Sequence, residues 1–271
     1  MGAGTDFASS TRKLRLRNVT NPLHSDIKRA AEIIRASKRL VAFTGAGISV
    51  ESGIAPFRGP GGLWETRDSD KFHKQYFMRH PEDSWQEIRE LFYEHVGQAK
   101  PNKAHLALAK LEQAGRLQAI ITQNIDSLHY KAGSREIYEF HGSLRELECL
   151  GCGRKCPYET VNLETLPPHC RSCGGLLKPD IVFFGEPIPE EPMRRATKAT
   201  HSCDVMLIIG STGEVQPAAR LPHYAKNRSG ATVIEVNIRP SAYTDVITDI
   251  FLQGPAAATL ESLKTEVLAY R

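Results

Sequence analysis

The chain reads Leu40-Val41-Ala42-Phe43-Thr44-Gly45-Ala46-Gly47 at residues 40–47. Its first five side chains suit burial on both faces, which is typical of a strand in a covered parallel sheet. The glycines that follow leave the backbone bare, so that it can approach a phosphate group closely. Four later runs have the same apolar character and are predicted strands: residues 119–122, 181–184, 205–209 and 232–236.

Helical patterns alternate with these strands. Ser25 is the predicted N-cap of a first helix, in which apolar residues recur at helical spacing. Asn102 is the predicted N-cap of a later helix that ends at Gly115. The alternation predicts an α/β fold built on a Rossmann-like doubly wound parallel sheet.

Four cysteines form two C-x-x-C pairs, and 17 residues separate the second cysteine from the third. This spacing is typical of a zinc ribbon, in which two knuckles place four thiolates around one Zn²⁺. Four sulfur ligands leave no open position, so the predicted zinc is structural. The alternative is four thiols, reduced or disulfide-bonded, that hold no metal. Cys156 and Cys203 fall outside the pattern, and the predicted metal ligands are Cys149, Cys152, Cys170 and Cys173.

The cysteine pairs lie between two predicted strands, so the zinc module is an expected insertion. We expect residues 143–180 to form a small zinc-binding domain. Residues 25–142 and 181–271 then form the large Rossmann-like domain, and residues 1–24 form an N-terminal extension. The basic stretch at residues 12–17 is interpreted as a solvated part of that extension rather than as a nucleic-acid-binding arm.

Composition fits an intracellular enzyme. The 271 residues are 41% hydrophobic and 24% charged, with a formal net charge of +4. This charge is small for the length, so no nucleic-acid partner is expected. No apolar run reaches the length of a membrane span, and no signal peptide is visible, so we expect no membrane partner and a cytoplasmic location. The oligomeric state is open, and a monomer is plausible.

Polar or glycine-rich residues follow four of the predicted strands. The carboxyl ends of parallel strands share one edge of a sheet, where ligands bind. Together these residues therefore predict a dinucleotide site. They are residues 44–49, residues 123–126, residues 210–212 and Asn237.

The glycine loop differs from a dehydrogenase fingerprint. G-x-G-x-x-G requires glycine at position 50, where this chain has Val50. The loop continues through residue 59 before any helix is expected, which suits a lid over a reactive sugar. Hydride transfer is therefore disfavoured.

The motifs of this chain stand in one order: Gly45-Ala46-Gly47-Ile48-Ser49, Gly53-Ile54, Phe57-Arg58-Gly59, Gln123-Asn124-Ile125-Asp126, His141-Gly142, the two cysteine pairs and Val182-Phe183-Phe184-Gly185-Glu186. Together they resemble those of the sirtuins, which are NAD-dependent protein-lysine deacylases. The resemblance covers residues 25 to about 265 and implies a Rossmann-like domain with a small zinc-binding domain.

The resemblance also implies roles for individual residues. Phe57 would cover the reacting sugar, with Arg58 steadying the lid, and Asn237 would reach the adenosine ribose. Val182, Phe183 and Gly185 would pair with the extended substrate backbone as an added strand. The implied substrate-binding set is Val182, Phe183, Phe184 and Gly185. The implied cofactor-binding set is Gly45, Ala46, Gly47, Ser49, Phe57, Arg58, Trp64, Gln123, Asn124, Ile125, Asp126, Gly210, Ser211, Thr212, Asn237, Ile238, Arg239 and Ala256.

His141 is the expected catalytic base, with Asn124 as a second catalytic residue. In the family's reaction the acyl oxygen attacks C1′ of the nicotinamide ribose and nicotinamide leaves. A ribose hydroxyl must then lose a proton, and imidazole accepts protons near neutral pH. The alternative for His141 is a buried structural histidine.

Two stretches depart from the family's pattern. Ala55-Pro56 stands where the family usually has proline and a variable residue, which bears on the lid. Gly213 and Glu214 alter one wall of the expected cofactor site. We still expect NAD to bind.

Deacetylation, or removal of a longer apolar acyl group, is the favoured activity. Members that remove succinyl or malonyl groups carry Tyr-x-x-Arg after a His-Pro dipeptide, whereas here Tyr76 and Arg79 precede His80-Pro81 and only Arg89 follows it closely. Two rival functions are mono-ADP-ribosyl transfer to protein and a non-enzymatic NAD-binding or zinc-ribbon interaction module.

Overall fold

The computed structural model of this chain describes residues 22–57 and 61–269. The basic stretch at residues 12–17 and Arg58 lie outside the described residues. Most of the expected N-terminal extension also lies outside them. The first helix begins at Pro22 rather than after Ser25, so the predicted N-cap at Ser25 is wrong. Proline is well tolerated in a first helical turn, because its missing N–H group has no partner there.

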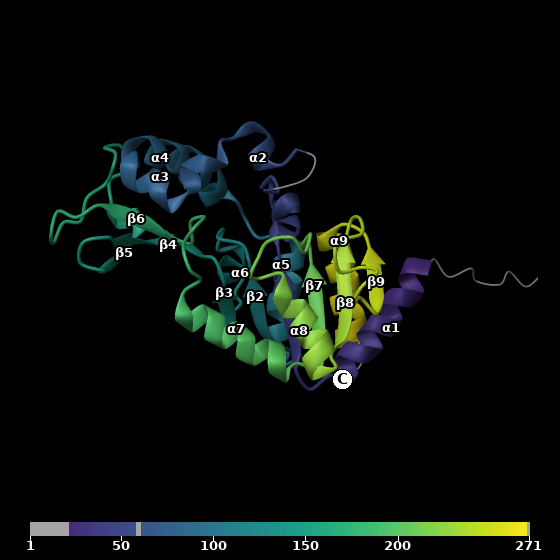
Figure 1. The fold of residues 1–271 in the computed structure, drawn as a ribbon. Helices are drawn as coiled ribbons and strands as arrows, with labels where there is room; N and C mark the ends of the chain where they lie inside the picture. Colours follow the sequence, from purple (N-terminus) through teal and green to yellow (C-terminus); the bar gives the residue numbers. More distant parts are fainter. Residues whose placement is uncertain (1–21, 58–60, 270–271) are drawn as a thin grey trace, which may run out of the picture.

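A large parallel sheet forms the centre of the described chain (Figure 1). Its strand order is β3-β2-β1-β7-β8-β9, which confirms the predicted doubly wound α/β fold. Its strands are β1 (Leu40–Thr44), β2 (Leu117–Thr122), β3 (Ile137–Glu139), β7 (Val205–Ile209), β8 (Thr232–Asn237) and β9 (Ile250–Gln253).

The carboxyl ends of the central strands are level with one another. Thr44 at the end of β1 pairs with Thr122 of β2 on one side and with Ile209 of β7 on the other. Ile209 in turn pairs with Val236 of β8. The loops that follow these strands therefore start from one edge of the sheet.

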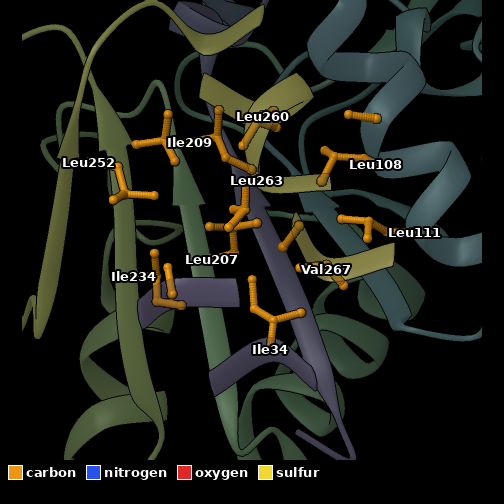
Figure 2. Packing of buried hydrophobic residues seen from close by; sticks show 14 of the residues in the cluster. Ile34, Leu108, Leu111, Leu207, Ile209, Ile234, Leu252, Leu260, Leu263 and Val267 are labelled. Atoms are coloured by element: carbon orange, nitrogen blue, oxygen red, sulfur yellow. The ribbon is translucent and has the colours of Figure 1, made fainter. Parts of the chain in front are cut away.

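Helices cover both faces of the sheet. Figure 2 shows Ile34 of α1, Leu108 of α5 and Leu263 of α9 directed at apolar side chains of the strands, and all three are fully buried. On the other face α7 and α8 bury a second apolar cluster around Phe43 and Met206. These helices are α1 (Pro22–Ala36), α5 (Lys103–Gln113), α7 (Glu190–Ser202), α8 (Arg220–Ser229) and α9 (Ala256–Leu268).

Helix α5 begins and ends as predicted. The Asn102 side chain accepts a hydrogen bond from the Ala104 N–H group at 2.8 Å, and His105 takes the place of the usual Glu or Gln in the capping box. Gly115, with φ of +69°, follows the last turn, where a left-handed residue commonly ends a helix.

The apolar run at residues 181–184 is not a strand of the parallel sheet, so that prediction is wrong. Ile181 ends β6 (Leu177–Ile181), which pairs with β4 (Gly142–Cys149) in a small antiparallel sheet together with β5 (Lys155–Pro157). Ile181 and Phe183 are buried in the core of the small lobe, and burial in either core produces the same apolar pattern.

The small lobe has a helical part as well as the zinc module. Figure 1 shows α3 (Lys74–Arg79) and α4 (Pro81–Ile88) beside β4 and β6, away from the large sheet. Trp85 of α4 is fully buried, and its indole N–H group donates to the Leu177 carbonyl at 2.9 Å. We propose that the small domain combines residues 143–180 with this helical segment, which the sequence-based division placed in residues 25–142.

Further short helices flank this region, among them the 3-10 helices Ser69–Phe72 and Val96–Gln98. The π-helix Arg89–His95 continues from α4, and α2 (Leu63–Thr66) lies beyond the glycine loop. Among the helices of residues 22–57 and 61–269, none has both the length and the apolar character that crossing a bilayer requires.

Candidate active site and metal centre

A cavity of about 390 Å³ lies where the carboxyl edge of the large sheet meets the small lobe. It brings together most of the residues predicted for the cofactor and substrate sites. The predicted residues that line it are Gly45, Ala46, Gly47, Phe57, Gln123, Asn124, Ile125, His141, Val182, Phe183, Phe184, Gly185, Gly210, Ser211, Thr212, Asn237, Ile238, Arg239 and Ala256.

Three glycines form the floor of this cavity because their backbones are in contact. Gly47 donates a hydrogen bond to the Gly210 carbonyl at 2.9 Å. A Cβ atom on Gly47 would lie 2.6 Å from the Gly210 Cα, and one on Gly45 would lie 2.8 Å from the Gly210 carbonyl oxygen. Gly210 also has φ of +59°, which disfavours other residues. The bare backbone suits close approach of a phosphate group.

The loop after these glycines is more ordered than predicted. Residues Ala46–Ser52 form a 3-10 helix instead of continuing as a loop, and it ends at Gly53 with φ of +85°. Glu51 accepts a hydrogen bond from the Ala257 N–H group at 2.7 Å, which ties this segment to the first turn of α9. Phe57 lines the cavity, whereas Arg58 lies outside the described residues and the side chain of Trp64, in α2, is not described.

Side-chain amides join the strand ends across the cavity. The Gln123 amide donates to the Ser211 hydroxyl at 3.0 Å, and the Asn237 amide donates to the Ser211 carbonyl at 3.1 Å. Asn124 is buried and donates to the Gly45 carbonyl at 3.2 Å. These bonds hold the segments that follow β1, β2 and β7, and the end of β8, around one space.

Ser49 and Asp126 lie in a smaller cavity of about 20 Å³ that borders the first. The Ser49 hydroxyl donates to the Asp126 carboxylate at 2.6 Å, and Asp126 also accepts from the Leu128 N–H group at 2.9 Å. Burial raises the pKa of Asp126, and these hydrogen bonds oppose that rise. Ile125 lines both cavities, so the 123–126 segment spans the cleft.

Two buried histidines support this region, and the sequence reading assigned them no role. The His105 ring lies 3.4 Å from the Ser49 hydroxyl, and burial lowers the pKa of His105 to about 4. His129 lies 2.9 Å from the Thr44 hydroxyl, and burial lowers its pKa well below 6.5. Both rings are therefore neutral near pH 7. The capping-box position of His105, three residues after Asn102, was the one available signal.

His141 is half-buried and faces the cavity from the segment between β3 and β4. Its Nδ1 atom lies 3.0 Å from the Gln123 carbonyl oxygen. A carbonyl only accepts, so Nδ1 carries the proton and Nε2 of the neutral ring keeps a free lone pair. Burial lowers the pKa of His141, and the hydrogen bond to Gln123 partly offsets this. The ring is thus arranged as a general base.

The residues predicted to bind the substrate backbone, 182–185, form one wall of the cavity, called the substrate wall below. Hydrogen bonds within the chain hold this wall in place. Val182 donates to the His141 carbonyl at 2.9 Å, Phe183 donates to the Glu186 carboxylate at 2.9 Å, and Phe184 donates to the Phe72 carbonyl at 3.0 Å. These three N–H groups are already used inside the chain. The Phe183 and Phe184 carbonyls already accept from the Glu186 and Lys74 N–H groups, each at 3.0 Å. A substrate strand therefore has Gly185 and the Val182 carbonyl to pair with.

The four paired cysteines come together at one point of the small lobe. Their sulfur atoms all lie within 4.8 Å of one another, with 3.4 Å between Cys149 and Cys173 and 4.0 Å between Cys152 and Cys170. Zn–S bonds of about 2.3 Å in a tetrahedron place the sulfurs about 3.8 Å apart, so the group fits zinc. Cys156 is not in this cluster of described residues.

Backbone groups around the cysteines favour thiolates. The N–H groups of Cys152 and Gly151 help to lower the pKa of Cys149 to about 6. At Gly175 a Cβ atom would lie 2.9 Å from the Cys149 sulfur. Glycine at this position therefore allows the two C-x-x-C segments to approach each other. A tetrathiolate cluster with no open position is a structural metal site.

A parallel α/β sheet, a glycine floor, a neutral histidine and a tetracysteine lobe define a nucleotide-binding protein with a metal-stabilised second domain. The Sir2 family model matches residues 45–217, more than half of the sequence. The chain belongs to the Sir2 family.

Named relatives and solved structures agree with this membership. The chain is 44% identical to NAD-dependent protein deacylase 2 of Pyrobaculum aerophilum over 88% of its length and 94% of that protein. It is 46% identical to NAD-dependent protein deacylase of Aeropyrum pernix over 86% of its length and 94% of that protein. A Sir2–p53 peptide–NAD+ structure superposes with a TM-score of 0.82 at 37% identity, covering 89% of this chain and 98% of that one.

Proposed function

We propose that this chain is an NAD-dependent protein-lysine deacetylase that transfers the acyl group to ADP-ribose and releases nicotinamide. The observation that carries the proposal is one cavity that holds the glycine floor, the His141 base and an apolar wall. The names of the relatives and the NAD and peptide in the similar structure support it.

The large domain would bind the co-substrate NAD. Gly45, Ala46 and Gly47 are assigned to its phosphates with Ser211 and Thr212, and Asn237 to the adenosine ribose. Gln123 and Asn124 would hold the nicotinamide ribose. Ile125 and Asp126 would hold the carboxamide in the smaller cavity. Ser49, Phe57, Arg58, Trp64, Gly210, Ile238, Arg239 and Ala256 complete the proposed set.

His141 would take one proton in this reaction. The acyl oxygen would displace nicotinamide from C1′ of the NAD ribose, after which a ribose hydroxyl would attack the acyl carbon. The C–N bond to lysine would then break, the lysine amine would leave, and one water molecule would complete O-acyl-ADP-ribose. The Nε2 lone pair of His141 accepts the proton of that hydroxyl, because Nδ1–H is held by Gln123. Asn124, anchored on Gly45, would hold the ribose in place for this transfer.

The acyl group meets apolar side chains. Phe72, Phe92, Ile181 and Phe183 line the small-lobe side of the cavity. Arg89 is directed elsewhere, since its guanidinium lies 3.2 Å from Glu94 and 3.4 Å from the Leu163 carbonyl. We therefore favour acetyl or longer apolar acyl groups over succinyl or malonyl groups, whose carboxylate needs a cationic partner.

Mass spectrometry of acyl-lysine peptides incubated with NAD tests the proposal. Wild-type protein is expected to release nicotinamide and form O-acyl-ADP-ribose, whereas His141→Ala is not. Labelled ADP-ribose on protein would indicate the rival transferase. Failure of every peptide to lose its acyl group, with NAD bound, would leave a non-enzymatic binding module.

The substrates would be acylated lysines of proteins. We also propose a cytoplasmic location, supported by six free cysteines in the described chain, because reducing compartments keep thiols available for zinc.

A further inference from the structure

Lys178 is a lysine buried beside the proposed substrate wall. Only 9% of its side chain is exposed. Its ammonium group donates to the Ile181 carbonyl at 2.6 Å and to the Pro179 carbonyl at 3.2 Å. It also lies 4.4 Å from the centre of the Phe183 ring. Lysine is rarely buried without a charged partner, so this arrangement calls for a specific explanation.

The partner is Glu186, whose side chain is 15% exposed. Its carboxylate lies 3.1 Å from the Lys178 ammonium and accepts the hydrogen bond of the Phe183 N–H group at 2.9 Å. Lys74 approaches its other oxygen only to 3.8 Å and is more than half exposed. Lys178 is therefore the principal cation that faces this carboxylate.

The pair joins the two ends of the wall. Lys178 holds the Ile181 carbonyl at one end, and Glu186 holds the Phe183 amide from the other. Between these anchors the chain must turn at Gly185, which has φ of +83°. A buried ion pair whose two members also hydrogen-bond to the backbone restricts the conformation of such a segment.

We propose that Lys178 and Glu186 are positioning residues that hold residues 181–186 in the conformation that receives the acyl-lysine segment of a protein substrate. This inference rests on the proposed function. Neither residue takes part in proton or group transfer. The pair acts on the peptide side of the cavity, whereas the glycine floor on the large sheet stays in place without it.

The position of Lys178 also relates the wall to the metal centre. The preceding residue, Leu177, pairs with Cys149 in the small antiparallel sheet, and Lys178 pairs with Glu148. Strand β6 thus starts beside a predicted zinc ligand and ends in the wall. The Lys178–Glu186 ion pair therefore stabilises the end of β6 that lies away from the cysteines.

Steady-state kinetics of Lys178→Met with an acetyl-lysine peptide and NAD tests the inference. We expect the peptide KM to rise about tenfold, as loss of a charged hydrogen bond implies, with kcat and the NAD KM within about twofold. Lys178→Arg keeps the charge and donors and should stay near wild type. The matched control is Lys155→Met, which removes the exposed ion pair to Asp180 of the same strand and should leave both KM values unchanged.

An unchanged peptide KM in Lys178→Met would overturn the inference. A parallel rise in both KM values would also overturn it, because that indicates a general structural role. If Lys178→Met does not fold, Glu186→Gln replaces it, since glutamine keeps an acceptor for Phe183 and loses only the charge. Its peptide KM must then rise.

A second measurement separates this inference from the proposed function. Amide hydrogen exchange at Phe183 requires no activity, and Lys178→Met should accelerate it at least about tenfold. Faster exchange in a chain that deacylates no peptide would count against the proposed function alone. Unaltered exchange would count against the positioning pair.

Discussion

The Nδ1 atom of His141 donates its proton to the carbonyl of Gln123, the first residue after β2, over 3.0 Å. The next residue, Asn124, donates its side-chain amide to Gly45 after β1. Strand β2 therefore ends in a segment that orients the proposed base with its backbone and the proposed ribose site with its side chains. The end of β2 therefore sets the distance between the proposed base and the proposed ribose site.

The pH dependence of kcat/KM should follow from this contact. Neutral His141 is the proposed base, and burial lowers its pKa below 6.5. Activity should therefore decline as the pH falls and the ring gains a proton, with the midpoint of this acid limb below pH 6.5. Initial rates between pH 5 and pH 8 measure this limb. A midpoint at or above 6.5 would contradict the burial argument.

Stability should respond to His105 in the acid range. In the unfolded chain this histidine binds a proton as the pH falls through about 6.5, whereas burial holds its folded pKa at about 4. Between these values the unfolded state binds more protons, so His105 lowers the free energy of unfolding by about 1.4 kcal/mol per pH unit of acidification. Urea unfolding at a series of pH values measures the slope.

The control for this slope is His105→Asn, which lacks the titrating ring. Glu139 has the opposite effect, because burial raises its pKa to about 7 and the folded state then binds the proton first. Because both proteins contain Glu139, its contribution cancels in the difference between their free energies of unfolding. A difference that does not change from pH 6.5 to pH 4 would show that His105 titrates normally.

Gly142 connects His141 to the small lobe and should tolerate no side chain. Its φ is +80°, and a Cβ atom would lie 2.1 Å from the Asp180 carbonyl oxygen. Gly142→Ala should lower the free energy of unfolding by about 3 kcal/mol, the combined cost of strain and overpacking. Gly153→Ala is the control, since φ is +69° there and nothing lies within 4 Å. Equal thermal shifts would contradict the contact argument.

Local signals in the sequence predicted the strands of the sheet's centre and the polar residues at their ends. Strands β1 and β7 are buried throughout, and β8 is buried at residues 233–236 although these include Glu235. The glycine and amide residues stand at the ends of these strands or directly after them. The two edge strands were missed. Both β3 and β9 are short and only partly buried, so their patterns are weak.

Features that depend on packing between distant segments could not be predicted. His105 contacts Ser49, from which it is separated by 56 positions in the sequence. His129 contacts Thr44, from which it is separated by 85 positions. The apolar run at 181–184 suits a buried strand and a buried cleft wall equally well. Only the complete fold shows that α4 supplies Trp85 to the core of the small lobe.

Acyl selectivity should follow the apolar lining of the cavity. Succinyl-lysine peptides place a carboxylate among Phe72, Phe92 and Ile181 on the small-lobe side. The arginine of the described lining, Arg239, lies on the other side, directly after β8 of the large sheet. An unpaired buried charge costs several kcal/mol, so kcat/KM should be at least about 100-fold lower for succinyl than for butyryl peptides. Competition between the two peptides measures the ratio directly. Equal rates would contradict the argument from the apolar lining.

Removal of zinc should abolish deacylation without destroying the large sheet. Cys149 is buried beside β6, and α4 packs on the same strand through Trp85, so loss of the metal frees the strand that ends in the substrate wall. Structural zinc sites supply about 10–16 kcal/mol of folding free energy, more than a small lobe retains without them. Cys149→Ser should therefore bind no zinc and turn over no peptide, while the glycine floor, carried by β1 and β7, continues to bind NAD.

Cys156→Ser is the matched control and should keep one zinc per chain and full activity, because Cys156 lies outside the cluster. Zinc analysis, calorimetry with NAD and deacylation assays on both variants measure these outcomes, and full activity in zinc-free protein would refute the structural role of the metal.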